Sequence, residues 1–244
     1  MTLLMTQTLN PSPLAETSSN APVTLESLVG VWKRTLLVEA NGMRDETSTV
    51  YWLQLGSFCG DIRLPGPGIQ AEPSAFAGCL TERDDIFRWT PELSRGIPPD
   101  AEPDEGYLKW EGGILREDGV HRPYLEHWQR VAEPGAQDYA LRFQDDGECV
   151  EGYLIRIADF AFHACRPLNG TARFVLAREN DEGWLIAEAL SDRLKPGEPF
   201  TWPAITRDMA DARGMAGCKF GAESVVTFER TPASGFPPPS EETP

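Results

Sequence analysis

The pattern of apolar and polar positions along the chain predicts a mainly β protein. Short segments rich in β-branched and aromatic residues alternate with turn signals such as Asn41-Gly42 and the Pro-Gly repeat at 65–68. Many short strands joined by Gly, Pro and Asp turns are typical of antiparallel barrels and sandwiches. The predicted strands cover 31–39, 47–55, 59–64, 76–80, 85–89, 106–110, 113–117, 124–131, 139–143, 152–165, 174–178, 184–190 and 225–230.

Two helical signals interrupt this pattern, and the turn at Pro134-Gly135 divides it. Residues 24–28 predict a turn of helix with Thr24 as its N-cap. A short helix is predicted at 204–213, after Pro203 and before the last strand. We therefore expect two folded halves and two unpacked tails rich in small polar residues and proline. The expected ranges are 1–22 (tail), 23–134 (first half), 135–231 (second half) and 232–244 (tail).

The first predicted strand begins with Gly30-Val31-Trp32, which resembles the Gly-x-Trp signature of the lipocalins and the wider calycin superfamily. The resemblance implies an antiparallel barrel in which the Trp closes one end and an Arg from a closing strand, here Arg130 or Arg230, covers it. An aromatic-x-Arg pattern recurs at Trp32, Trp128 and Phe228 and puts ring and guanidinium on one strand face. Such an Arg either closes the barrel end or binds an anion. We expect an all-β, calycin-like fold with two barrel-like halves.

Charge and cysteine usage narrow the choice of partners. The 244 residues include 38 acidic and 22 basic ones, a formal net charge of −16, which repels phosphate backbones and anionic membranes. No apolar run is long enough to span a bilayer, and the first 20 residues lack the features of a signal peptide. The five cysteines include no CxxC pair. We predict a cytoplasmic protein with free thiols that binds neither nucleic acid nor membranes nor a structural metal.

Two neighbouring predicted strands carry side chains suited to a ligand site. Asp61 and Arg63 share one strand face. On an ordinary strand these charges would lie in water, whereas in a ligand-holding barrel they would point into the lumen. Trp52 and Gln54 share a face one strand earlier. In a lumen they would supply a stacking ring and an orienting amide.

Two further segments carry candidate acid–base groups. Tyr124, Glu126 and Trp128 share one strand face. If that face is buried, a carboxyl between two aromatic rings has a raised pKa and can act as a general acid or base; if it is exposed, Glu126 is an ordinary surface residue. His163 alternates with Asp159 and Cys165 along a predicted long strand. It is either an assisting acid–base group or a structural, partly buried histidine.

The sequence lacks the motifs of several large enzyme classes and leaves three hypotheses. There is no Walker loop, dinucleotide-binding glycine motif, HExxH or GxSxG. The first hypothesis is a barrel that binds a small, largely apolar molecule without metal or cofactor. The second is a cofactor-independent lyase, isomerase or cyclase, and the third is a protein-interaction module. In the second, Glu126, Asp61 and His163 would be catalytic. In the first two, the ligand-binding residues would be Trp52, Gln54, Arg63, Tyr124 and Arg34.

Overall fold

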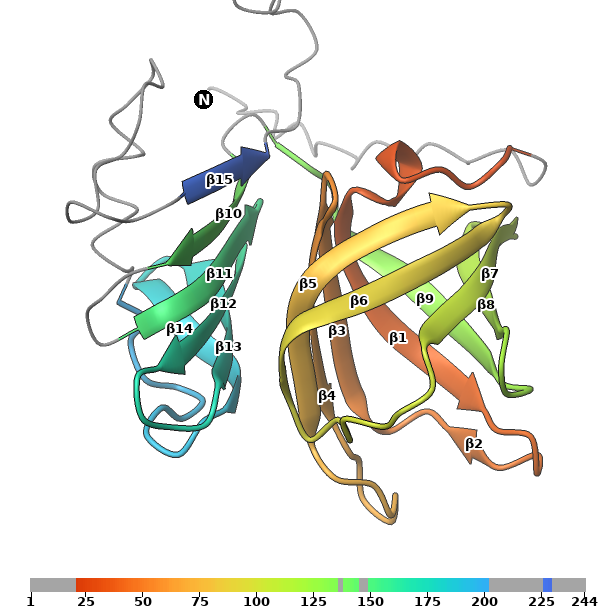
Figure 1. Cartoon of the computed structure of the whole chain (residues 1–244), viewed down its shortest axis with the longest axis horizontal. Coiled ribbons are helices and arrows are strands. Elements are labelled where there is room, and N and C mark those ends of the chain that lie inside the picture. Colours follow the sequence, from red (N-terminus) through yellow and green to blue (C-terminus); the bar gives the residue numbers. More distant parts are fainter. Residues whose placement is uncertain (1–20, 136–137, 145–148, 202–225, 230–244) are drawn as a thin grey trace, which may run out of the picture.

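The protein consists of a β-barrel and a second, open β-sheet that packs against it (Figure 1). This computed structural model describes residues 21–135, 138–144, 149–201 and 226–229. The predicted boundary at residues 134–135 falls in the connection between the barrel and the sheet. The predicted helix at 204–213 and Arg230 lie outside the described residues.

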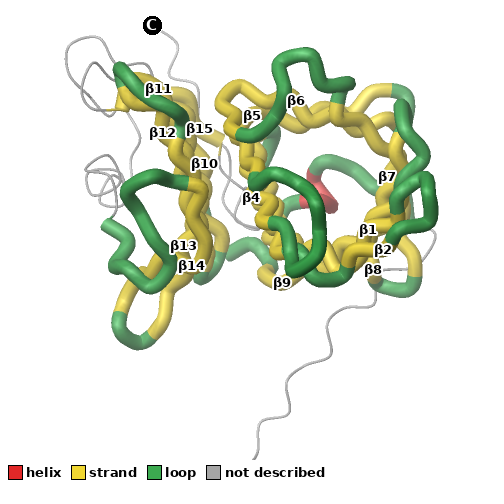
Figure 2. Tube along the Cα trace, turned by 90° about the horizontal axis from the view of Figure 1, so that it is seen from below, coloured by secondary structure: helices red, strands yellow, loops and turns green. Residues whose placement is uncertain are grey.

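The first half of the chain closes into an antiparallel barrel. Strands adjacent in the chain pair with each other, except that β2 pairs only with β1, and β9 returns to pair with β1. In Figure 2 the eight barrel strands form a ring, with the short helix η1 at one end. The elements are η1 (Glu26–Leu28), β1 (Gly30–Val38), β2 (Arg44–Asp45), β3 (Thr49–Leu55), β4 (Phe58–Leu64), β5 (Ser74–Arg83), β6 (Ile86–Arg95), β7 (Asp104–Glu111), β8 (Ile114–Gly119) and β9 (Leu125–Ala132).

The second half differs from the barrel that the sequence predicted. Its six strands form an open sheet in the order β14-β13-β12-β11-β10-β15, and within the described residues no pairing joins its edges. One face of this sheet is covered by the outside of the barrel, so its apolar side chains are buried without closure. The strands are β10 (Tyr139–Gln144), β11 (Cys149–Ile157), β12 (Phe160–Pro167), β13 (Arg173–Asn180), β14 (Gly183–Leu190) and β15 (Val226–Glu229).

The segment 152–165, predicted as one long strand, is a hairpin of β11 and β12. The chain reverses at Ala158 and Asp159, where Ala158 has a φ of 51°. That backbone conformation is uncommon for a residue other than glycine. The carboxylate of Asp138 accepts a hydrogen bond of 2.9 Å from the Ala158 N–H. The turn is therefore held by a residue outside the hairpin and contains neither glycine nor proline.

An apolar core fills the space between the barrel and the sheet. Phe58 of β4 meets Tyr153 of β11 edge to face, with ring centroids 5.8 Å apart. Gly60 of β4 lies directly against Phe162 of β12, because a Cβ atom at Gly60 would lie 2.3 Å from the Phe162 ring. We call this set the interlayer core; its buried members also include Leu53, Leu55, Ile62, Ile155, Phe160, Phe174 and Leu176.

The cysteines depart in part from the predicted free thiols. Cys59 and Cys79 are not disulfide-bonded, whereas Cys165 is disulfide-bonded. Disulfide pairing depends on which cysteines the fold brings together, and sequence spacing does not give this. In the described part of the chain, no helix has the length and apolar character that crossing a membrane requires.

Candidate functional site: the barrel lumen

The η1 end of the barrel is closed by Trp32 and Arg130. The Trp32 indole N–H donates a 2.7 Å hydrogen bond to the carbonyl of Leu28 in η1. The guanidinium of Arg130 lies over the Trp32 ring, 4.5 Å from its centroid, and donates to the carbonyl of Ser27. Arg130 thus takes the covering position expected for an Arg of a closing strand. Because the Trp32 indole and the Arg130 guanidinium bind each other and η1, we interpret Arg130 as closing this end of the lumen and not as binding an anion.

Beside this closed end lies an indole layer, which we define as Trp32, Trp52, Trp89, Trp110 and Trp128. Trp52 stacks on Trp32 with centroids 5.9 Å apart and meets Trp89 and Trp128 edge to face at 5.5 and 5.7 Å. Gln54 also points inward, accepting from the Trp52 indole N–H at 3.1 Å and donating to the carbonyl of Gly56 at 2.7 Å. Its amide therefore orients Trp52 within the barrel wall.

The lumen also holds a charged layer organised around Arg34 and Arg63. Arg34 of β1 binds Glu126 of β9 at 2.6 Å and Asp45 of β2 at 3.1 Å. Asp45 also accepts hydrogen bonds from the backbone N–H groups of Thr47 and Ser48. These contacts tie the connection between β1 and β3 to the barrel interior.

Arg63 of β4 makes the second set of ion pairs. It binds Asp61 at 2.7 Å and Asp104 of β7 at 3.1 Å. The Asp61 side chain is 3% exposed, while those of Arg63 and Asp104 are 35% and 27% exposed. Asp61 therefore points into the barrel, as the lumen alternative proposed, and solvent reaches the lumen at Arg63 and Asp104.

Glu117 of β8 is a lumen residue that sequence reasoning missed. It is 3% exposed and accepts hydrogen bonds from the Tyr124 hydroxyl at 2.6 Å and the Trp128 indole N–H at 3.0 Å. Glu117 lies two residues after the buried Leu115 on the same strand, so both side chains point into the barrel. On neighbouring β7, Leu108 is paired with Glu117, and Gly106 lies diagonally across from it. Gly106 leaves space that Glu117 fills, since a Cβ there would lie 2.8 Å from the Glu117 Cγ. The position of Glu117 two residues after Leu115 and the glycine at position 106 are the sequence features that could have indicated a buried Glu117.

The charged layer has five carboxyl groups, of Asp45, Asp61, Asp104, Glu117 and Glu126, for two guanidinium groups. Burial raises the pKa of Asp61 to about 6, although Arg63 opposes the shift. Burial, with the neighbouring charge of Glu126, raises the pKa of Glu117 well above its ordinary value. Burial also raises the pKa of Glu126 against the effect of Arg34. In the described residues, no three His, Cys, Asp or Glu side chains are placed to hold a metal ion.

Asp45 behaves in the opposite way. Burial would raise its pKa, but hydrogen bonds from Ser48 and Thr47 and the charge of Arg34 lower it to about 2. Asp45 is therefore a fixed anion near neutral pH, whereas Asp61 and Glu117 are the groups whose charge is adjustable.

The structure brings together all but one of the predicted site residues. His163 lies on β12 of the second sheet, on the face turned away from the barrel, with its ring 6.2 Å from that of Phe200. Burial and the charge of Arg173 lower its pKa to about 4, so it is neutral. The prediction that His163 shares a cavity with Glu126 and Asp61 is wrong, because the second half does not form the same lumen. The residues that do lie within the barrel are Arg34, Trp52, Gln54, Asp61, Arg63, Tyr124 and Glu126.

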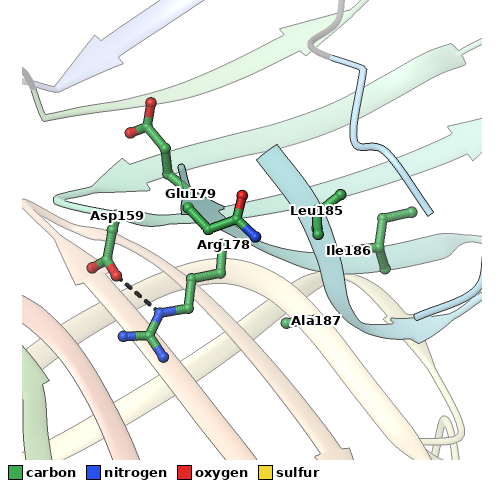
Figure 3. Close-up of a pocket in the computed structure, with 7 residues that line it drawn as sticks. Asp159, Arg178, Glu179, Leu185, Ile186 and Ala187 are labelled. Atoms are coloured by element: carbon green, nitrogen blue, oxygen red, sulfur yellow. Dashed lines mark hydrogen bonds and ion pairs between the residues drawn. The ribbon is translucent and has the colours of Figure 1, made fainter. Parts of the chain in front are cut away.

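A separate surface depression lies on the second sheet (Figure 3). It has a volume of about 350 Å³ and is lined mainly by residues of β13 and β14. Arg178 in this depression binds Asp159 at 2.9 Å, and its guanidinium lies 4.9 Å from the centroid of the Phe160 ring. None of the predicted site residues lines it. The barrel lumen is therefore the better candidate for the functional site.

Comparison with known proteins adds information on the fold alone. No protein-family model and no curated protein matches the sequence. Among solved structures, the chain is similar to the crystal structure of an uncharacterized protein, YLR301w, from Saccharomyces cerevisiae. The TM-score is 0.50 at 15% sequence identity, and the match covers 65% of this chain and 84% of that one.

Proposed function

We propose that the barrel binds a small molecule in its lumen and that the molecule enters at the end opposite η1. The η1 end is closed by the contacts of Trp32 and Arg130. Solvent reaches the charged layer at Arg63 and Asp104. The Gly30-Val31-Trp32 signature and the covering Arg130 further support a calycin-like type of barrel.

The observation that carries the proposal is the charged layer inside the barrel. Replacing buried ion pairs by apolar side chains of similar volume is often neutral or stabilising. Stability alone therefore does not explain why a barrel interior should keep Arg34, Asp61 and Glu126. The interlayer core of the same protein is apolar, which shows that this chain builds an ordinary core where nothing else is required.

The arrangement also indicates the chemistry of the ligand. An apolar or aromatic body would pack on the indole layer, whose rings favour flat and edge-on contacts. A polar end would meet Arg63 and Asp104, where solvent reaches the charged layer. We therefore extend the first hypothesis: the ligand is small and largely apolar, and it carries one polar end.

A second candidate function is acid–base catalysis without a cofactor, as in a lyase, isomerase or cyclase. The observation that favours it is the pKa of about 6 for Asp61, close to neutral pH and beside a guanidinium. General acids and bases work best when their pKa lies near the working pH. Asp61 or Glu126 would move the proton, and Arg63 or Arg34 would stabilise a developing negative charge.

Native mass spectrometry of the protein purified from its own source tests binding directly. We expect a bound small molecule that is retained by the wild type and by the control variant Arg88→Gln, whose side chain is 55% exposed on the barrel. Arg63→Gln should weaken retention at least tenfold, about 1.4 kcal/mol. Absence of any bound molecule, or equal retention by Arg63→Gln and Arg88→Gln, would contradict the proposal.

The catalytic candidate needs a separate measurement, which is turnover of the molecule identified in this way. Asp61→Asn and Glu126→Gln should each abolish conversion while remaining folded at the assay temperature and retaining the molecule. Retention with no conversion by the wild type would leave binding as the function and contradict catalysis.

A further inference from the structure

Two buried carboxyl groups face each other across neighbouring strands of the barrel. Glu117 of β8 and Glu126 of β9 are paired positions in the antiparallel register. Both side chains point into the lumen, and the two residues are 3% and 7% exposed. Directly opposite positions in an antiparallel pair bring side chains close together, and like charges there are destabilising. The fold therefore places a repulsive pair where water screens it little.

The two groups differ in the partners available to them. Glu126 binds the guanidinium of Arg34 at 2.6 Å, which favours its ionised form. Among the residues that the structure describes, Glu117 has no cation within hydrogen-bond distance; its partners are the neutral Tyr124 hydroxyl and Trp128 indole.

Charged groups on the other barrel elements do not remove this imbalance. Arg34 is shared with Asp45 of β2. Arg63 of β4 is already paired with Asp61 and with Asp104 of β7. Arg63 is thus matched by two anions of its own, and within the described part of the chain no counter-ion remains for Glu117.

We propose that Glu117 and Glu126 share one proton at neutral pH, held mainly by Glu117, and that they form the acid–base pair of the lumen. Two interacting buried carboxyls titrate as a pair, so the second proton leaves only at a markedly higher pH. A protonated Glu117 keeps all its contacts: its O–H donates to the Tyr124 oxygen, while the Trp128 indole donates to its other oxygen. This arrangement leaves the Tyr124 hydroxyl hydrogen for a group in the lumen. Only this last consequence rests on the proposed binding function.

Infrared spectroscopy of the ligand-free protein tests the shared proton. At pH 8, where Asp61 is ionised, we expect a C=O stretching band of a protonated, buried carboxyl in the wild type. The band should disappear in Glu117→Gln and persist in Glu82→Gln, a control in which an exposed glutamate of β5 is changed. In Glu126→Gln the like-charged neighbour is absent, so the Glu117 band should titrate at a lower pH than in the wild type.

The Glu126→Gln result keeps the test decisive even if Glu117→Gln does not fold. No such band in the wild type at pH 8, or a band that Glu126→Gln leaves at the same titration midpoint, would overturn the proposal. Because this measurement uses no ligand, its failure would leave retention of a small molecule in mass spectrometry untouched. Conversely, absence of a bound molecule would leave the shared proton unaffected.

Discussion

The protein has two interiors built on opposite rules. The interlayer core is apolar and is formed by outward-facing barrel residues and the inner face of the sheet. The lumen combines the indole layer with a charged layer of five carboxyl and two guanidinium groups. Strands β3 and β4 take part in both, through alternate residues. A single strand can thus serve stability on one face and chemistry on the other.

If the interlayer core provides stability, removal of the aromatic ring at its centre should lower the free energy of unfolding more than any other change. Phe162 is fully buried. Phe162→Ala should lower the free energy of unfolding by about 4 kcal/mol, because the lost contacts and the cavity add together. Urea unfolding followed by far-UV circular dichroism measures this. The control Leu168→Ala, at a position 68% exposed, should change stability little. Equal effects of the two variants would refute the role assigned to the interlayer core.

The charged layer should be sensitive to loss of one partner and tolerant of a complete apolar replacement. Arg34→Met leaves Glu126 and Asp45 without their shared cation and should cost about 3 kcal/mol. The triple variant Arg34→Met, Asp45→Asn, Glu126→Leu should recover most of this loss, measured by thermal unfolding at pH 7. If the triple variant is less stable than Arg34→Met, the charged layer contributes to stability after all.

The close approach of the barrel and the second sheet at Gly60 allows a smaller effect on stability to be tested. Gly60→Ala puts a methyl group 2.3 Å from the Phe162 ring. The methyl group forces β4 and β12 apart and should lower the free energy of unfolding by about 2 kcal/mol. Gly112→Ala offers a comparison at a glycine whose added Cβ would meet nothing within 4 Å, although its positive φ of 58° adds a backbone cost of its own. Restoration of stability in the double variant Gly60→Ala, Phe162→Leu would attribute the loss to this contact. No restoration would place its cause elsewhere.

The smallest expected effect is confined to the pH dependence of stability. The pKa of Asp61 rises from 3.8 to about 6 on folding, so the folded state binds the proton more tightly. This contribution is fully present below pH 3.8 and is lost as the pH rises through about 6. Asp45, with a pKa lowered to about 2, has the opposite sign: its contribution is present above 3.8 and lost as the pH falls.

Asp61→Asn should therefore flatten the stability profile between pH 4 and pH 7, and Asp45→Asn should flatten it below pH 4. Thermal unfolding across this range measures both profiles. An Asp61→Asn profile parallel to that of the wild type would show that Asp61 has an ordinary pKa.

Much of the fold follows from local patterns in the sequence. The predicted barrel strands lie within three residues of the observed ends, because each combines alternation with a nearby turn signal, except that β6 extends to Arg95, six residues beyond its predicted end. The grouping of Trp52 with Gln54 and of Asp61 with Arg63 on shared strand faces also follows, since residues two apart on a strand point to the same side. What alternation does not give is which face turns inward. Closure of the strands into an eight-stranded barrel determines which face of each strand lies inside.

The misses have physical causes of the same kind. The turn at Ala158 depends on a hydrogen bond that its N–H donates to the carboxylate of Asp138, a residue of the connection before β10. His163 was grouped with the lumen because a second barrel was expected, but the second sheet is buried by the first barrel instead. Glu117 becomes a candidate only when the neighbouring strand is known to bring Gly106 against its side chain. Each error concerns a contact between segments distant in the sequence.

The indole layer has a consequence for optical studies of this chain. Five of its seven tryptophans belong to that layer, and the interlayer core contains none. Ultraviolet emission of the protein is therefore dominated by the barrel, and excitation energy passes readily among rings less than 6 Å apart. Detachment of the second sheet would change this signal little, whereas any event inside the barrel would be reported without an added dye.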